Sequence, residues 1–387
     1  MKNHFLSEFN GFNGLFFRKL KSSNKTLGLF LCMSFLSVLT ISSGCKTKKL
    51  ASDKDSKSYV IYPAPPEQAR IQYLTKITSS ADLGKKQSFF TKLIVGQVKN
   101  KGIVKPYGIS IHKGKIYVCD QYGGGMEIID LEKKDFQFFR PKGKGQLRAP
   151  INCFVDEKGY LYVADVGRLE IVVYDESGKY VKCFGEKEKF KPTDVFVYHD
   201  KIFVANTEGN KINVFSNDSI NKLLYSFPEV EPSDKAFLGI PANITVGKER
   251  VYVSDFGHSM VKIFTTDGKF IDTIGSRGDR IGQFSKLKGI AVDSEANVYA
   301  VDAGFDHVQI FNKDGKLLLV IGGHFQEQGP GGLIIPAQVI IDYDNLKYFQ
   351  RYVDPAYDLK YLIIVTSQYG PNLINIYGRV EPKTKPK

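Results

Sequence analysis

Apolar and polar positions alternate along most of the chain beyond residue 60, and this period of two is typical of β-strands. In NVYAVDAGFDHVQIFNKDGKLLLVIGG, residues 297–323, three such runs are separated by the Gly, Asp and Asn residues of turns. The arrangement recurs at IYVCDQYGGGMEIID, LYVADVGRLEIVVYD, IFVANTEGNKINVFS, VYVSDFGHSMVKIFT and LIIVTSQYGPNLINIYG. The six copies lie roughly 40 to 50 residues apart, except for a longer last step, so the chain is built from repeats.

Each copy predicts a four-stranded antiparallel sheet. A first strand such as YGISIH precedes each quoted run, and a fourth strand such as KLLLVIG follows it. The second strand ends at a short polar side chain that can bind the amides of the next turn; these residues are Asp120, Asp165, Asn206, Asp255, Asp302 and Ser367. Both faces of such a sheet are apolar, so the copies must pack around a common centre to cover them. The predicted fold class is all-β, a six-bladed β-propeller.

The last copy ends after its third strand, INIYGRV, and lacks a fourth. The segment RIQYLTKI, residues 70–77, has strand periodicity and precedes the first copy. We therefore expect it to be the outer strand of the last blade, which would close the ring with strands from both ends of the chain.

The copy KGIAVDSEANVYAVDAGFDHVQIFNKDGKLLLVIG, with GSRGDRIGQFSKL before it, resembles the NHL repeats that build six-bladed propellers. The resemblance covers residues 70–378. The flank YPAPPEQARIQYLTKITSSADLG and the ending VTSQYGPNLINIYG also resemble bacterial six-bladed propeller lipoproteins. The resemblance implies an NHL-type propeller closed by an N-terminal outer strand in the last blade.

The first residues have the pattern of an export signal. A basic segment precedes the apolar run LGLFLCMSFLSVLTI and the small residues before Cys45, which resemble a lipobox. We expect a signal peptide with lipobox in residues 1–44, lipidation of Cys45, a flexible tether in 45–60, the propeller in 61–378 and a basic tail in 379–387. The protein would then be a bacterial membrane-anchored lipoprotein on the periplasmic or cell-surface side. An uncleaved membrane anchor is the alternative.

The formal net charge of +13 lies mainly in residues 1–26, 46–58 and 379–387. The body carries little excess charge, which argues against nucleic acid as a partner. The cysteines Cys119, Cys153 and Cys183 show no paired spacing, and we expect them to be small apolar residues on strands.

Loops after the second strands and segments between blades share one face of a propeller, where binding residues are common. The candidate binding residues on this face are Tyr122, Arg148, Arg168, His258, Arg277, Phe305 and Tyr369. The alternative is a solvated rim without a ligand. The predicted partner is a cell-envelope protein or a small ligand, with the membrane contacted through the lipid anchor.

Some NHL-type propellers are lyases with zinc held by histidines, and some six-bladed propellers are esterases with calcium in the channel. The resemblance thus makes a metal-dependent lyase or lactonase the alternative to a binding scaffold. We expect His258, His307 and His324 on one face and His112 and His199 on the other, without the close spacing of zinc ligands. The repeated aspartates are expected to hold turns. The sequence therefore favours a scaffold with no cofactor. Zinc or calcium would be the cofactor only in the enzyme alternative.

Two further segments interrupt the repeat. The insertion DNLKYFQRYVDPAYDLKYL, residues 344–362, predicts a short helix whose aromatic residues pack back on the last blade, with a partner contact as the alternative. The segment QSFFTKLIVGQV, residues 87–98, is expected to form a lid over the closing strand, with a membrane-contacting helix as the alternative.

Overall fold

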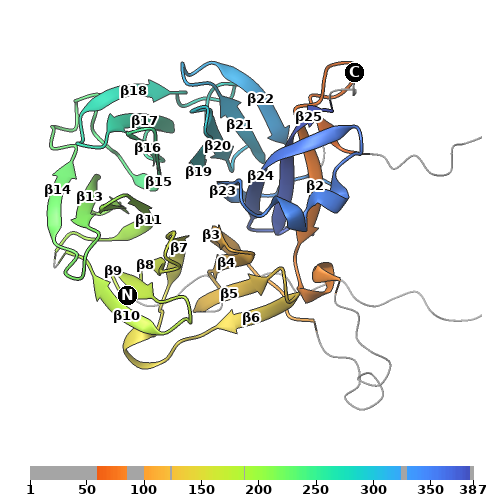
Figure 1. Cartoon of the computed structure of the whole chain (residues 1–387). Coiled ribbons are helices and arrows are strands. Elements are labelled where there is room, and N and C mark those ends of the chain that lie inside the picture. Colours follow the sequence, from red (N-terminus) through yellow and green to blue (C-terminus); the bar gives the residue numbers. More distant parts are fainter. Residues whose placement is uncertain (1–58, 85–99, 123, 187, 324–328, 384–387) are drawn as a thin grey trace, which may run out of the picture. The chain divides into compact units, whose positions relative to one another are not determined.

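Six antiparallel sheets stand around a common centre in the computed structural model (Figure 1). The structure describes residues 59–84, 100–122, 124–186, 188–323 and 329–383, all within the compact unit Lys57–Lys387. Contacts join the innermost strands of every two neighbouring blades, including those of blades six and one. The ring is therefore closed, and the predicted six-bladed propeller is confirmed.

In blades one to five the strands follow one another outward from the centre in chain order. The first three blades are β3 (Pro106–His112), β4 (Lys115–Asp120), β5 (Gly125–Asp130) and β6 (Asp135–Phe139); β7 (Pro150–Val155), β8 (Leu161–Asp165), β9 (Glu170–Tyr174) and β10 (Tyr180–Phe184); and β11 (Pro192–Tyr198), β12 (Lys201–Asn206), β13 (Lys211–Ser216) and β14 (Leu223–Phe227). Two 3-10 turns, η1 (Ser80–Leu83) and η2 (Gly143–Gly145), lie before blades one and two.

Blades four to six complete the ring. They are β15 (Pro241–Gly247), β16 (Arg250–Asp255), β17 (Met260–Thr265) and β18 (Phe270–Ile274); β19 (Leu287–Val292), β20 (Val298–Asp302), β21 (His307–Phe311) and β22 (Leu317–Gly322); and β23 (Pro336–Asp342), β24 (Tyr357–Ser367) and β25 (Ile374–Pro382), with β2 (Ile71–Ile77) and β1 (Ile61–Tyr62) outside them.

Blade six is closed by the start of the propeller, as predicted. Strand β2 pairs antiparallel with β25, with Ile71 opposite Arg379 and Ile77 opposite Ile374. Strand β1 adds a fifth strand beyond it. Because β25 continues through Pro382, the propeller extends past residue 378, where we had placed its end.

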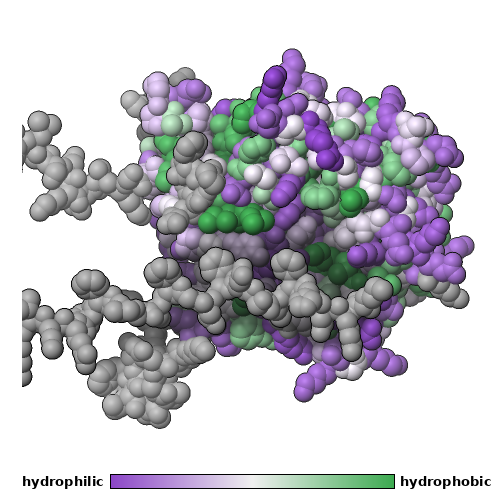
Figure 2. Space-filling view, turned by 180° about the vertical axis from the view of Figure 1, so that it is seen from behind, coloured by the Kyte–Doolittle hydropathy of each residue, from purple (hydrophilic) through white to green (hydrophobic). Residues whose placement is uncertain are grey.

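The core lies between the blades and is divided into clusters that each join neighbouring sheets. One cluster combines Cys119 and Met126 of blade one with Val163 and Val172 of blade two. Side chains of this kind stabilise a fold by roughly 1.5 to 3 kcal/mol each when fully buried. On the face drawn in Figure 2, hydrophilic residues predominate and hydrophobic ones form a few small groups. Most apolar burial is thus achieved between the blades.

The repeated aspartates have the structural role that we predicted, and they do more than hold the turn. The carboxylate of Asp165 accepts hydrogen bonds from the amides of Gly167 and Arg168 in the turn, both at 3.0 Å. It also accepts from the amides of Arg148 at 2.7 Å and Ala149 at 2.9 Å, just before β7. Each such residue therefore fastens the end of the second strand to the segment that enters the first strand of the same blade.

The same pattern recurs in other blades. Asp120 binds the amides of Val104 and Lys105, and Asp302 binds those of Ser285 and Lys286. In blade six the hydroxyl of Ser367 has no hydrogen-bond partner in the described part of the chain, and the corresponding amide of Ile335 is bound by Asp306 of blade five.

The insertion of blade six forms two 3-10 turns, η4 (Leu346–Tyr348) and η5 (Gln350–Tyr352), in place of a helix. Its aromatic residues pack back on the protein, as expected: Phe349 is buried, and the hydroxyl of Tyr361 lies 2.7 Å from that of Tyr299 in blade five. The predicted lid, residues 87–98, lies outside the described residues. In the described part of the chain, no helix has the length and apolar character needed to cross a membrane.

Cys119 lies on β4, Cys153 on β7 and Cys183 on β10. The first two are buried, and the third is partly exposed. The expectation of apolar residues on strands is confirmed for the buried pair.

We expect Asp165→Ala to lower the free energy of unfolding by about 3 kcal/mol, because it leaves four backbone amides without their charged acceptor. Denaturant unfolding followed by circular dichroism measures this. The control Asp314→Ala, in an exposed turn of blade five, should change the value by less than about 0.5 kcal/mol. Equal effects of the two variants would contradict the proposed fastening.

Removing the closing strand should open the ring. We expect a protein lacking residues 1–78 to lose cooperative thermal unfolding, since β25 and the apolar residues beneath β2 would be exposed. A protein lacking residues 1–58 is the matched control and should keep one sharp transition by circular dichroism. Indistinguishable transitions would show that β2 is not needed for closure.

Candidate functional site: the central channel

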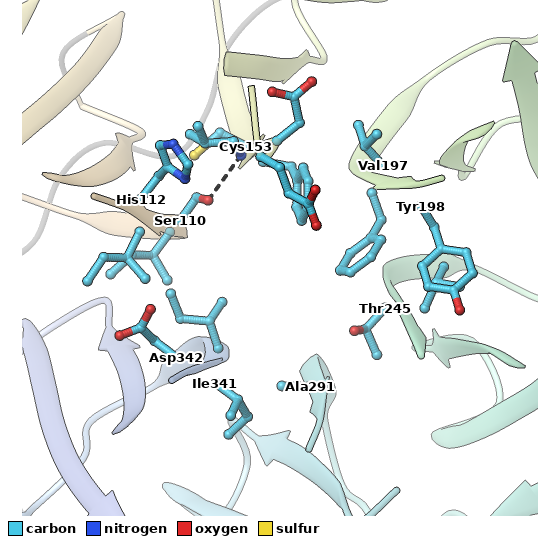
Figure 3. Close-up of a pocket in the computed structure, with 18 of the residues that line it drawn as sticks. Ser110, His112, Cys153, Val197, Tyr198, Thr245, Ala291, Ile341 and Asp342 are labelled. Carbon is cyan, nitrogen blue, oxygen red and sulfur yellow. Dashed lines mark hydrogen bonds between the residues drawn. The ribbon is translucent and has the colours of Figure 1, made fainter. Parts of the chain in front are cut away.

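A cavity of about 980 Å³ occupies the centre of the ring and is lined by the innermost strands of all six blades (Figure 3). Residues in the turns that follow these strands also line it, including Lys113, Glu157, His199 and Asp344. The cavity therefore opens at the face formed by the turns between first and second strands, which we call the hairpin face. The loops after second strands and the segments between blades form the opposite, loop face.

The wall of the cavity comes from the same place in every innermost strand. The fifth residues of these strands are Ser110, Phe154, Phe196, Thr245, Ala291 and Ile340. In Figure 3, Ser110, Thr245 and Ala291 lie around an open centre. The rings of Phe154 and Phe196 contact each other, with centroids 4.6 Å apart. Three small residues leave space that the larger ones do not fill, so the wall is wide, and it combines apolar side chains with the hydroxyls of Ser110 and Thr245.

A polar layer lies next to this wall, at the third residue of each innermost strand. The side chains of Asn152 and Gln338 occupy the space where a Cβ on Gly108 and Gly289 would stand, so glycine is needed beside each amide. The buried Nδ2 of Asn152 and Oε1 of Gln338 have no hydrogen-bond partner among the residues that the structure describes. Such buried atoms are costly unless a ligand or water binds them.

Asp194 is the acidic member of this layer. Its side chain is buried, and its carboxyl oxygens accept from the amides of Val195 and Ile244, both at 2.9 Å. Burial raises the pKa of Asp194 to about 8, and the two amide hydrogen bonds only partly oppose that rise. Asp194 is therefore largely protonated at neutral pH and presents a neutral, hydrogen-bonding floor to the cavity.

The rim of the cavity carries charged groups, several of which are already engaged. Asp342 accepts from the Asn345 amide at 3.0 Å, and Asp156 accepts from the Tyr160 amide at 2.8 Å. Burial, followed by the charge of Lys113, lowers the pKa of His112. His112 is thus mainly neutral at pH 7.

The seven predicted binding residues do not line this cavity. Tyr122 and Arg148 are exposed, and Tyr369 is 49% exposed. The segments that carry Tyr122 and Tyr369 lie close together, because their neighbours Gln121 and Gln368 are hydrogen bonded at 3.3 Å.

The other four predicted residues are partly engaged in local contacts. The guanidinium of Arg168 binds Glu170 at 2.6 Å, and that of Arg277 binds the Gly257 carbonyl at 2.5 Å. Phe305 stacks on His307, with centroids 5.8 Å apart. These contacts give Arg168 and Arg277 structural roles, while their part in binding stays a prediction.

The histidines considered for zinc are also held locally. The Nδ1 of His258 lies 2.6 Å from Asp255, and burial lowers the pKa of the largely buried His307. His324 lies outside the described residues. Within the described ranges, no group of three His, Cys, Asp or Glu side chains could hold a metal ion.

Sequence reasoning missed the cavity because it placed binding on the loop face. The signal was the fifth residue of each first strand, which is small in three copies and bulky in three. The sequence does not show that these six positions face one another, since that requires the closed ring.

The comparisons with known proteins agree on the fold. A family model described as 6-bladed beta-propeller matches residues 223–308. No curated protein matches the sequence. A structural genomics protein of unknown function from Bacteroides thetaiotaomicron is 16% identical, with a TM-score of 0.57, over 81% of this chain and 77% of that one. A structure titled "Streptogramin B lyase structure" is 12% identical, with a TM-score of 0.50, over 71% of this chain and 93% of that one.

At such low identities these structures are similar to this chain in fold alone. Together with the matched family model, they show that the chain is a six-bladed propeller.

The buried carboxyl group of Asp194 makes stability depend on pH. Its pKa is higher in the folded state, about 8, than in the unfolded state, about 4, so the folded state holds the extra proton. Stability should fall as pH rises from about 4 to about 8, by up to about 1.4 kcal/mol per pH unit. We expect Asp194→Asn to lose this component of the slope and Asp314→Asn to keep it, as measured by denaturant unfolding across that range. An unchanged slope in Asp194→Asn would show that this carboxyl does not carry the dependence.

Proposed function

We propose that the protein is a lipid-anchored, extracytoplasmic binding scaffold that holds a small ligand in its central channel. The observation that carries the proposal is the channel cavity of about 980 Å³, whose wall combines apolar side chains with two hydroxyls above a polar floor. Ligand sites are typically concave, mostly apolar, about 300 to 1,000 Å³ in volume, and supplied with a few polar groups that fix orientation.

The lining indicates what kind of ligand would fit. Phe154, Phe196 and Ile340 offer apolar contact, and at the floor Asp194 and Gln338 offer a hydrogen-bond donor and acceptor. A molecule with an apolar body and one uncharged polar end would satisfy both. A negatively charged end is disfavoured there, because it would repel the carboxylate whenever Asp194 loses its proton.

The anchor is supported by the N-terminal sequence. The apolar run before Cys45 and the small residues at 42–44 fit an acylated cysteine, and the polar residues 46–58 fit a tether. The resemblance to NHL-type propeller lipoproteins supports the same placement in the cell envelope. An anchored propeller would present its cavity to ligands or partner proteins near the membrane.

The lipid anchor can be tested in cells. We expect Cys45→Ala to abolish incorporation of an alkyne-tagged fatty acid, because the acylated thiol is gone. Cys32→Ala, within the apolar run, is the control and should leave labelling unchanged. Labelling of Cys45→Ala at the level of the unchanged protein would rule out this anchor.

The cavity can be tested with the uncharged apolar dye Nile red and residues 57–387. We expect saturable binding that Thr245→Phe and Ala291→Phe each weaken at least about tenfold, since a benzyl group would fill space beside Phe154 and Phe196. Lys316→Phe adds the same ring to an exposed turn and should have no effect. Fluorescence titration gives the affinities, and circular dichroism checks the fold. Unchanged binding in both cavity variants would place the dye elsewhere and count against the proposal.

A further inference from the structure

Three lysines gather at the other end of the channel, on the loop face. Lys288 is the second residue of β19, and Lys286 directly precedes that strand. Lys105 directly precedes β3 of blade one. The charges of Lys105 and Lys286 both act on Lys288. None of the three lines the cavity described above. We call them the lysine cluster.

Two tyrosines and two glutamines position this cluster. The ammonium of Lys288 lies 5.5 Å from the ring centroid of Tyr107 and donates to Oε1 of Gln368 at 2.9 Å. The ammonium of Lys105 lies 5.3 Å from the ring centroid of Tyr369. Gln368 is in turn hydrogen bonded to Gln121. The positive groups of blades one and five are thus held at a shared mouth, bridged by the loop of blade six.

The cluster is not neutralised within the described part of the protein. No carboxylate there forms an ion pair with any of the three lysines. Asp306 is the acidic group that acts on Lys288, at longer range, and its carboxylate binds the Ile335 amide. Asp194, whose carboxyl acts on Tyr107, is largely protonated at neutral pH and supplies little compensating charge.

A buried lysine in blade four shows the usual arrangement for a cation removed from water. The side chain of Lys262 in blade four is 3% exposed, and its ammonium lies 3.4 Å from the carboxylate of Asp255. A buried cation normally has such a partner, because desolvation of an unpaired charge is costly. Lys288 has a neutral amide in that place.

We propose that the lysine cluster binds a small oxyanion, a carboxylate or a phosphate group, at the loop-face mouth of the channel. The Lys288 ammonium has three N–H donors and uses one of them on Gln368, so two remain for the anion. The anion would supply the negative charge that the described residues lack.

Protonation of Lys288 makes the site sensitive to pH. Burial, followed by the charges of Lys105 and Lys286, lowers the pKa of Lys288 to about 8. Tyr107, which also faces it, stays neutral because burial raises its pKa to about 12. Anion affinity should therefore be highest below pH 8 and fall as Lys288 loses its proton above that value.

The test uses the full chain in a nonionic detergent, with inorganic phosphate and citrate as separate probes in isothermal titration calorimetry. We expect saturable binding of at least one probe, and which one binds tells whether phosphate or carboxylate is preferred. Lys288→Gln should weaken binding about tenfold or more, since one charge-assisted contact is lost. Lys316→Gln, in an exposed turn of the same blade, should bind like the unchanged protein.

Two further readouts separate binding from a structural effect. Lys288→Arg should keep the affinity within a few-fold but lose the decline between about pH 7 and pH 9, because arginine stays charged. Thr245→Phe should leave phosphate and citrate binding unchanged, which distinguishes this site from the channel cavity. The proposal is overturned if neither probe binds, or if Lys288→Gln binds as tightly as the unchanged protein.

Discussion

The apolar faces of each blade can be covered only by the neighbouring blades. Strands such as β8 and β16 are buried along almost their whole length, and the clusters around them draw side chains from adjacent sheets. A blade with an uncovered face would expose its apolar side chains to water. The last blade must therefore pack against the first, which closes the ring. The pairing of β2 with β25 closes the ring. Because these strands are joined by backbone hydrogen bonds within one sheet, the two ends of the propeller are held together inside blade six.

Closure also fixes the chemistry at the centre. Six first strands are brought side by side, and each contributes one residue to every layer of the channel. The layers differ because the copies have diverged: the third residues are two glycines, three amide side chains and Asp194, while the fifth residues are three small side chains, two phenylalanines and Ile340. Asp194 and Lys288 come from different blades, and both owe their altered pKa values first to burial.

The two ends of the channel therefore have different characters. The hairpin face opens into a cavity with both apolar and polar side chains and a neutral floor, while the loop face carries three lysines that have no carboxylate partner among the described residues. A propeller with two unlike sites could bind two ligands, or two parts of one partner. The repeated aspartates keep this centre in place, because they hold the segments that enter the innermost strands.

The sequence by itself determined the repeat, the strands, the closing segment and the structural role of the aspartates. These depend on local periodicity and on the need to cover apolar faces, and both can be recognised in short stretches such as residues 297–323. The sequence also placed Tyr122 and Tyr369 on one face.

Only the tertiary structure decided where a cavity exists and which lysines have no carboxylate partner among the described residues. Ser110, Thr245 and Ala291 are far apart in the chain, and the sequence around each of them does not show that they line the same cavity. Likewise, Lys105 and Lys288 look like ordinary surface lysines until blades one, five and six meet. Volume and desolvation are properties of groups brought together across the ring, so they arise only when the ring closes.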